Sequence, residues 1–284
     1  MGSANFIKSP LNYIGGKYKI LPQILEYFPS SINNFIDLFA GGLDVAANVK
    51  SNKTFCNDIN FYTIQIYEAM QNKSIDDILY YIDDRIKEFS LTKTNEEAYK
   101  KFRSYYNSTK NPLDLYILVC YSFNYQFRFN SKHEYNNPFG KNRSCFNSTI
   151  RDNLIKFHSN IKNFVFSAEN FKDYNISFMG NSDFLYADPP YRITVGSYND
   201  GKRGFEGWDK EDDIILFNRL DDLNSRGVKF ALSNVSEHRG QINNELVSWA
   251  KKYNVYQIEK SYNNSSYQVK DKNSVTKEIL VVNY

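Results

Sequence analysis

The chain has 284 residues, of which 42% are hydrophobic, and its formal net charge is only +3. This length suits one domain of ordinary size with a smaller one, and no apolar run reaches the roughly 20 residues that a membrane helix needs. The three cysteines and three histidines are scattered without a CxxC pattern or a Cys/His cluster, so neither a zinc site nor a disulfide framework is predicted. The N-terminus has no secretory h-region, and we expect a cytoplasmic protein.

Short buried strands alternate with helices at the start of the chain. A helix is expected over residues 18–27, after a turn that contains glycine. Residues 35–39 form a short apolar run that ends in two glycines, which predicts a strand, a tight turn and a helix beginning near Leu43. Residues 54–56 predict a second strand. This order is typical of the beginning of a doubly wound α/β sheet.

The middle of the chain lacks strand signals. Apolar residues at helical spacing between positions 60 and 121 predict a helical insertion, and the aromatic and polar segment at about 123–141 predicts a hairpin or a long loop. The sheet pattern then resumes, and a helix with Asp209 as its N-cap is expected to end near residue 224. The further strands are expected at 163–166, 183–187, 228–232, 255–258 and 278–282.

The strongest chemical signal is a buried strand that ends in Asp188-Pro189-Pro190-Tyr191. Open α/β sheets bind ligands beyond the carboxyl ends of their strands. The two prolines fix φ and remove two N–H donors, so the carbonyls beside them face the site as stiff acceptors. A carboxylate and a carbonyl together can accept both hydrogens of an amino group, and Tyr191 can stack on a planar ring. Taken alone, the segment is also explained as an ordinary turn.

Two further segments indicate a small-molecule pocket. Glycines in the run 37–42 would let a ligand approach the backbone closely. Asp58, at the end of the next predicted strand, is placed to accept hydrogen bonds from ribose hydroxyls. Near the N-terminus, Tyr13 and Lys17 flank a glycine pair that could close over a ligand, and an aromatic face there would favour a cation. Each segment alone also fits a plain turn.

These motifs, in this order and spacing, resemble the Dam family of adenine-N6 DNA methyltransferases, which includes the phage Dam enzymes. The resemblance covers nearly the whole chain, from Tyr13 to Tyr284. It implies an α/β fold with a doubly wound methyltransferase-type sheet, in which residues 1–60 and 161–284 form the S-adenosylmethionine-dependent catalytic domain. Residues 61–160 would form an inserted helical and β-hairpin DNA-recognition domain. The implied cofactor is S-adenosylmethionine, and the implied partner is double-stranded DNA.

The resemblance also implies roles for single residues. The family's catalytic motif, which binds a flipped-out adenine, matches Asp188, Pro189, Pro190 and Tyr191. The family's cofactor-binding positions match Tyr13, Lys17, Asp37, Phe39, Ala40, Gly41, Asp58, Asp183 and Phe184. The last two match an Asp-Phe pair that contacts the adenine of the cofactor, although Ser182 precedes them here where glycine is usual.

The segment at about 123–141 resembles the family's recognition hairpin. Arg128 is assigned to the guanine before the target adenine, because the arginine fork binds guanine O6 and N7 together. The other positions expected to contact DNA are Gln126, Asn130, Pro138, Lys141 and Arg143. GATC is the first recognition sequence to consider, but Gln126 stands where the family usually has an apolar residue, which leaves the second half of the site open. Alone, the segment is also explained as a solvated polar loop.

The implied reaction is a direct methyl transfer to adenine N6, with the target base rotated out of the duplex. No covalent enzyme intermediate is expected because no cysteine lies in the motifs, and neither a metal nor a membrane is expected to take part. The glycine-rich segment 201–207 is expected to form a loop over the target base. A cognate restriction endonuclease is one candidate partner, and the sequence leaves open whether the chain protects against such a nuclease.

Three other functions remain open at this point. The first is methylation of RNA or of a protein glutamine, for which the related motif more often begins with Asn than with Asp. The second is a DNA-binding module that retains the fold without catalysis, against which the intact Asp188, Tyr191, Asp37 and Asp58 argue. The third is a restriction endonuclease of matching specificity, for which we find no well-placed Asp…Glu-x-Lys constellation.

Overall fold

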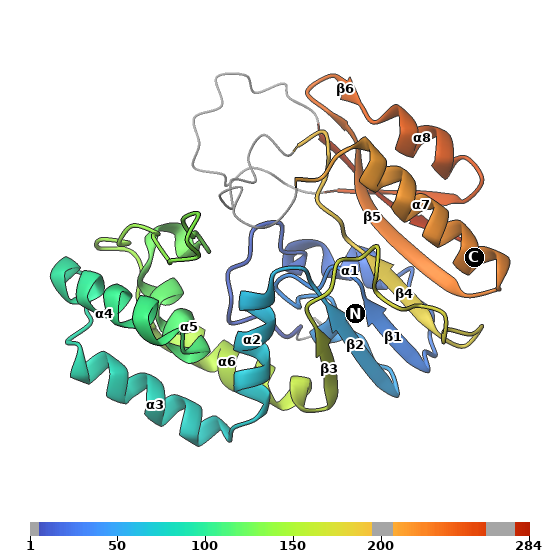
Figure 1. Cartoon of the computed structure of the whole chain (residues 1–284). Coiled ribbons are helices and arrows are strands. Elements are labelled where there is room, and N and C mark those ends of the chain that lie inside the picture. Colours follow the sequence, from blue (N-terminus) through green and yellow to red (C-terminus); the bar gives the residue numbers. More distant parts are fainter. Residues whose placement is uncertain (1–5, 195–206, 260–275) are drawn as a thin grey trace.

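The computed structural model describes residues 6–194, 207–259 and 276–284, and the expected loop at 201–207 lies almost entirely outside them. The described strands form an eight-stranded sheet in the order β3-β2-β1-β4-β5-β8-β7, with β6 paired to β5 (Figure 1). The strands are β1 (Asn34–Asp37), β2 (Lys53–Asn57), β3 (Phe164–Ser167), β4 (Phe184–Ala187), β5 (Lys229–His238), β6 (Gln241–Ile242), β7 (Asn254–Ile258) and β8 (Thr276–Val282). The doubly wound α/β fold expected from the sequence is confirmed.

The first five strands of this order run parallel, whereas β8 pairs antiparallel with both β5 and β7. All four residues of β4 are buried, as expected for a central parallel strand that is covered on both faces. Phe184 and Tyr186 pack with α1 and α2 on one face, and Leu185 and Ala187 pack with α7 and α8 on the other. The alternation of side chains along β4 therefore separates two layers of helices.

The inserted helices pack around α5, whose ten residues are all apolar, aromatic or small except Asp114. Figure 1 shows α3, α4 and α5 to one side of the sheet, and α2 contacts both α5 and β3. The α-helices of the described residues are α1 (Leu21–Leu25), α2 (Phe61–Gln71), α3 (Ile75–Glu88), α4 (Glu96–Thr109), α5 (Pro112–Tyr121), α6 (Ser148–Asn160), α7 (Lys210–Ser225) and α8 (Asn244–Ala250). Among these, no helix is both long and apolar enough to cross a membrane.

Two local expectations need correction. No α-helix begins near Leu43, whose φ of 60° is left-handed, and only a short 3₁₀ turn follows at Ala46–Asn48. The run 18–27 is divided into a 3₁₀ turn and α1, because Pro22 lacks the N–H that a continuous helix would need. The segment at about 123–141, predicted as a hairpin or a long loop, is a loop with two isolated antiparallel bridges, Ser122 with Phe139 and Phe129 with Tyr135. By contrast, Asp209 caps α7 as predicted, with a full capping box.

Candidate active site

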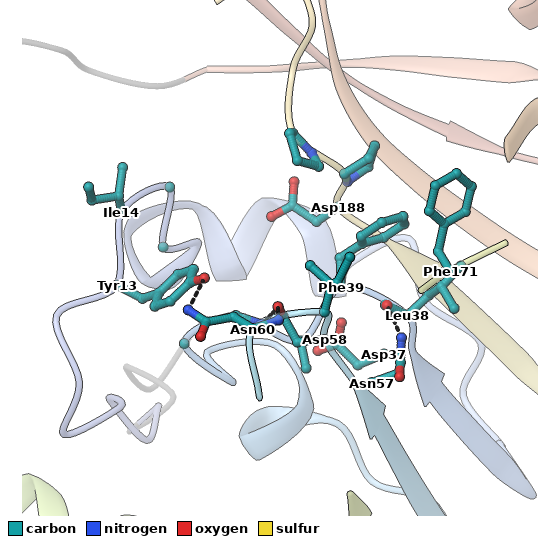
Figure 2. A pocket seen from close by; sticks show the side chains of 18 of the residues that line it. Tyr13, Ile14, Asp37, Leu38, Phe39, Asn57, Asp58, Asn60, Phe171 and Asp188 are labelled. Carbon is teal, nitrogen blue, oxygen red and sulfur yellow. Dashed lines mark hydrogen bonds between the residues drawn. The ribbon is translucent and has the colours of Figure 1, made fainter. Parts of the chain in front are cut away.

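A cavity lies at the carboxyl ends of the parallel strands, where the sequence predicts a ligand-binding site (Figure 2). Figure 2 shows Asp37, Asp58 and Asp188 facing this space, with Tyr13 and Phe171 on opposite sides of it. The chain segments that line the cavity are 12–17, 37–42, 57–60, 125–127, 169–172 and 188–190, together with Asp44, Val45, Tyr186, Gly207, Trp208 and Asp212. Segments far apart in the sequence therefore build one site.

The glycine turn after β1 brings the backbone close to this cavity. Gly41 has a φ of +45°, and a Cβ placed there would lie 3.1 Å from the ring of Tyr13. Two hydrogen bonds hold the turn. The Gly41 amide donates to Asp58 Oδ2 at 2.7 Å, and the Gly41 carbonyl accepts from the Tyr67 hydroxyl at 2.8 Å. A side chain at position 41 would therefore disturb both the turn and the wall formed by Tyr13.

Asp58 organises its surroundings through both carboxylate oxygens. In addition to the bond from Gly41, its Oδ1 accepts from the Asn60 amide at 2.8 Å, and the Asn60 side chain donates to the Tyr13 hydroxyl at 3.3 Å (Figure 2). Burial raises the pKa of Asp58, and the two backbone amides oppose that rise. Each carboxylate oxygen has further lone pairs, so Asp58 can still accept from a ligand hydroxyl in the cavity.

Asp37, the last residue of β1, is 2% exposed and lines the cavity. Its Oδ1 has no hydrogen-bond partner among the residues that the structure describes. Burial raises the pKa of Asp37 well above its usual range, and the neighbouring Asp188 and Asp58 raise it further. Because a buried polar atom is normally satisfied, this oxygen fits a site whose ligand brings a donor or a positive charge.

The residues after β4 form a compact polar network with Lys17. Asp188 Oδ2 lies 2.6 Å from Lys17 Nζ, and Asp188 Oδ1 accepts from the Tyr191 hydroxyl at 2.8 Å. Glu278 of β8 completes the network, with Oε1 3.1 Å from the Tyr191 hydroxyl and 3.8 Å from Lys17 Nζ. Burial raises the pKa of Asp188, while Lys17 and Tyr191 lower it. Four polar groups from three separate parts of the chain thus meet at the end of β4.

Aromatic rings form the opposite wall of the cavity. The centroid of Phe39 lies 5.4 Å from that of Phe171 and 5.5 Å from that of Trp208, and the last two rings are 4.9 Å apart. The Trp208 indole N–H donates to the buried Asp213 at 2.8 Å, which fixes the orientation of the ring. Flat apolar faces next to buried carboxylates suit a ligand that carries both a planar ring and a cation.

The structure brings most of the predicted site residues together. Those that line the cavity are Tyr13, Lys17, Asp37, Phe39, Ala40, Gly41, Asp58, Asp188, Pro189, Pro190 and, from the DNA-reading segment, Gln126. Tyr191 does not line it. Its ring is 7% exposed and packs with Ile193 and Val235, so the face expected to stack on a base is covered here.

Asp183 and Phe184, which were expected to contact the cofactor, lie at the other end of β4 and do not line the cavity. Asp183 accepts hydrogen bonds from the amides of Asn34 and Gly180, at 3.0 and 2.8 Å. The ring of Phe184 is fully buried and lies edge-on to Phe28, 4.6 Å between centroids. Asn170 and Phe171, shortly after β3, line the cavity instead.

The remaining predicted DNA contacts lie on the loop after α5. Arg128, Pro138, Lys141 and Arg143 are exposed. Asn130 is committed to the loop itself, because its Oδ1 accepts from the Glu134 amide at 3.0 Å and its Nδ2 donates to the Glu134 carboxylate at 2.6 Å.

Buried aromatic packing beneath the loop fixes its path. Phe129 stacks on Tyr62 of α2 with centroids 3.8 Å apart and an angle of 8° between the rings. Gly140 admits no side chain, since a Cβ there would lie 2.2 Å from Ser144 Oγ. The exposed side chains of the loop are therefore carried by a backbone with a defined shape.

Sequence reasoning missed Glu278, Phe171 and Trp208. Glu278 is 1% exposed within the otherwise apolar end of β8, and a single carboxylate inside an apolar strand is the signal that could have found it. Phe171 could have been found from its position just beyond a parallel strand. Trp208 gives no comparable local signal, since its place in the wall depends on Asp213 in α7.

Comparison with known proteins agrees with this geometry. The family model described as D12 class N6 adenine-specific DNA methyltransferase matches residues 13–264. The chain belongs to this family. The resemblance to adenine-N6 DNA methyltransferases that the motifs suggested is therefore confirmed, and the catalytic motif, the glycine turn and the N-terminal segment all fall within the matched range.

Individual relatives in this family are type II enzymes and DNA adenine methylases. The chain is 49% identical over 282 residues to the type II methyltransferase M.FokI of Planomicrobium okeanokoites and 47% identical over 283 residues to the modification methylase StsI of Streptococcus sanguinis. These matches cover 99% and 98% of this chain but 43% of each relative, so the chain spans less than half their length. The DNA adenine methylase of Escherichia coli K12 is 25% identical over 186 residues, which is 64% of each chain.

Proposed function

We propose that this D12-class chain transfers a methyl group from S-adenosylmethionine to the N6 amino group of an adenine in double-stranded DNA. The observation that supports the proposal is that one cavity contains both an acceptor for an amino group and a turn that suits a small cationic ligand. The Asp188 carboxylate, which suits an amino group, shares this cavity with the Asp37 and Gly41 turn. The spare oxygen of Asp37 and the close approach at Gly41 suit a small cationic ligand.

The cavity fits S-adenosylmethionine on the chemistry of its lining. Asp37 would offer a buried acceptor to the ligand's donors, Asp58 would accept from its ribose hydroxyls, and Phe39 and Phe171 would offer ring faces to its adenine. Several buried carboxylates surround this space, and they favour a positively charged ligand over a neutral one. When bound, the cofactor supplies a methyl group on an activated sulfonium, so the protein needs neither a metal nor a nucleophile of its own.

The protein would contribute mainly by holding the amino group in line. Asp188 would accept one amino hydrogen and the Pro189 carbonyl the other, which localises the lone pair on nitrogen. The C–S bond of the bound cofactor would break as the N–C bond forms, and the Asp188 carboxylate would accept the proton that the amino nitrogen then loses. A positioning mechanism of this kind depends on rigid acceptors, and the two prolines at 189 and 190 provide that rigidity.

Residues 61–160 would act as the target-recognition domain. Arg128, Lys141 and Arg143 stand exposed on the loop after α5, and Gln126 on the same loop faces the cavity. Extruding a base costs roughly a few kcal/mol, which contacts to phosphates would offset. Because two relatives are named as a type II methyltransferase and a modification methylase, we propose that the chain protects DNA against a cognate restriction endonuclease.

Methyl transfer from labelled S-adenosylmethionine to unmethylated duplexes tests the proposal. GATC duplexes are compared with duplexes altered at one base and with RNA of the same sequence. Labelling of GATC alone would confirm the chemistry and the assignment of Arg128. Labelling at other GA-containing sites would retain the chemistry and reject GATC. Absence of transfer to any DNA, with cofactor binding intact, would reject the proposed function.

A further inference from the structure

The acceptor that the proposed reaction requires is already engaged in this structure. Both oxygens of Asp188 have partners, with the Lys17 ammonium at 2.6 Å from Oδ2 and the Tyr191 hydroxyl at 2.8 Å from Oδ1. The Lys17 ammonium also donates to the Gly15 carbonyl at 3.0 Å. A target amino group that approached Asp188 would therefore meet a protein cation that occupies a similar position. If the amino group takes the place of the ammonium on Oδ2, Lys17 needs another acceptor.

Lys17 has little access to water as an alternative. Its side chain is 4% exposed, and a buried ammonium without a carboxylate partner is strongly unfavourable. Glu278 lies near the same cation, with Oε1 3.8 Å from Nζ and its side chain 1% exposed. The distance is longer than a hydrogen bond but close enough for a small rotation of the lysine side chain to form one.

Glu278 also reaches the catalytic motif directly. Its Oε1 lies 3.1 Å from the Tyr191 hydroxyl, which at present is closer to Asp188. The tyrosine hydroxyl and the lysine ammonium thus share the same two carboxylates, Asp188 after β4 and Glu278 on β8. Both donors can move their hydrogen bonds from one carboxylate to the other without entering solvent.

We propose that Glu278 is a positioning residue that receives the Lys17 ammonium, and with it the Tyr191 hydroxyl, when the target amino group binds Asp188. The inference rests on the proposed function. Glu278 does not touch the substrate. It keeps Lys17 paired throughout, so that exposing the acceptor on Asp188 does not leave a buried charge unpaired.

The variants Glu278→Gln, Lys17→Gln and their combination test this role. The glutamine at 278 keeps the shape but offers a weaker acceptor, so Lys17 should remain on Asp188. We expect kcat/KM for duplex DNA to fall roughly tenfold, within the usual range of coupling between contacting groups, while the affinity for S-adenosylmethionine is retained. Lys17→Gln should also lower activity, and the double variant should be no worse than Lys17→Gln alone.

A second readout follows base extrusion directly. With 2-aminopurine at the target position, the fluorescence rise on binding should be smaller for Glu278→Gln than for the wild type at equal occupancy. Glu237→Gln is the matched control, because Glu237 is a carboxylate of β5 that pairs with Lys277 at the surface. Its activity and fluorescence should match the wild type.

Three outcomes would overturn the inference. These are wild-type kcat/KM in Glu278→Gln, losses that simply add in the double variant, or an unchanged 2-aminopurine signal. If Glu278→Gln does not fold, as judged by thermal unfolding, Tyr191→Phe takes its place. It removes the hydroxyl that joins the two carboxylates and should show the same non-additivity with Lys17→Gln. A wild-type chain that methylates no DNA contradicts the proposed function itself, whereas these outcomes in an active wild type contradict only the role of Glu278.

Discussion

The cavity at the sheet and the loop after α5 use polar side chains in opposite ways. At the cavity, Asp37, Asp58 and Asp188 are largely buried, and their positions are fixed by backbone amides, Tyr191 and Lys17. On the loop, the basic side chains are exposed and only the backbone is fixed, by buried aromatic packing beneath it. A reaction that depends on atomic placement needs the first arrangement, whereas adaptation to a duplex surface needs the second.

The largest expected effect is a loss of methyl transfer, and it should occur for a substitution at one end of β4 and not at the other. Asp188→Ala should lower methyl transfer by about 10³-fold, since it removes a preorganised acceptor, and should leave the fold and cofactor affinity in place. Asp183→Ala is the matched change at the opposite end of the strand. It should lower the free energy of unfolding by about 1–3 kcal/mol, because the Asn34 and Gly180 amides lose their acceptor, with kcat retained in the folded fraction. Labelled transfer and thermal unfolding measure both, and near-normal activity of Asp188→Ala would refute its role.

A smaller effect should distinguish specific from general contacts on the loop. Arg128→Ala should cost about 2 kcal/mol of binding at the preferred sequence and relax the preference at one base. Lys141→Ala should weaken binding to all sequences alike and reduce the slope of log K against log salt by about one. Binding titrations over a range of salt with matched and mismatched duplexes would reveal the difference. Identical behaviour of the two variants would mean that Arg128 reads no base.

The smallest effect concerns the cost of burying Asp37. A carboxyl whose pKa is raised by folding contributes stability that is present at low pH and lost as the pH rises through the folded pKa. Asp37→Asn should therefore raise Tm at pH 8, by about 2 °C or roughly 1 kcal/mol for a chain of this size, and raise it less at pH 4. The same variant should bind S-adenosylmethionine more weakly. Calorimetry without cofactor at the two pH values checks this, and an equal shift at both would exclude titration of Asp37 as the cause.

Much of the sheet could be predicted from the sequence because its buried strands are short runs of apolar residues. The strands around Asp37, Cys56 and Ala187 lie close to their predicted places, and Asp209 caps α7 as expected. The prediction of a helix near Leu43 was wrong because the turn there has a left-handed backbone conformation, which the spacing of apolar residues does not indicate. Asp183 matches a motif by residue type, but the direction of β4 places it at the end of the strand that lies away from the cavity.

The least predictable residues of the site are those that come from distant segments of the chain. Glu278 meets Lys17 only because β8 enters the sheet beside β5, and this antiparallel pairing leaves no local pattern around either residue. Trp208 reaches the cavity through its bond to Asp213, which depends on where α7 packs. Local motifs therefore predicted most of the residues that line the cavity. The residues that contact them from distant segments, Glu278 and Trp208, could be found only from the three-dimensional arrangement.

The place of β8 in the sheet has a consequence for synthesis. Of the described strands β8 is made last, yet it lies inside the sheet between β5 and β7. A nascent chain that has not reached residue 276 lacks the strand that, among the described residues, pairs with both β5 and β7, so both strands keep an unpaired edge. Such a chain also lacks Glu278, so the polar network at Asp188 is incomplete until β8 emerges. Premature termination there should yield aggregation-prone, inactive fragments rather than a shortened enzyme.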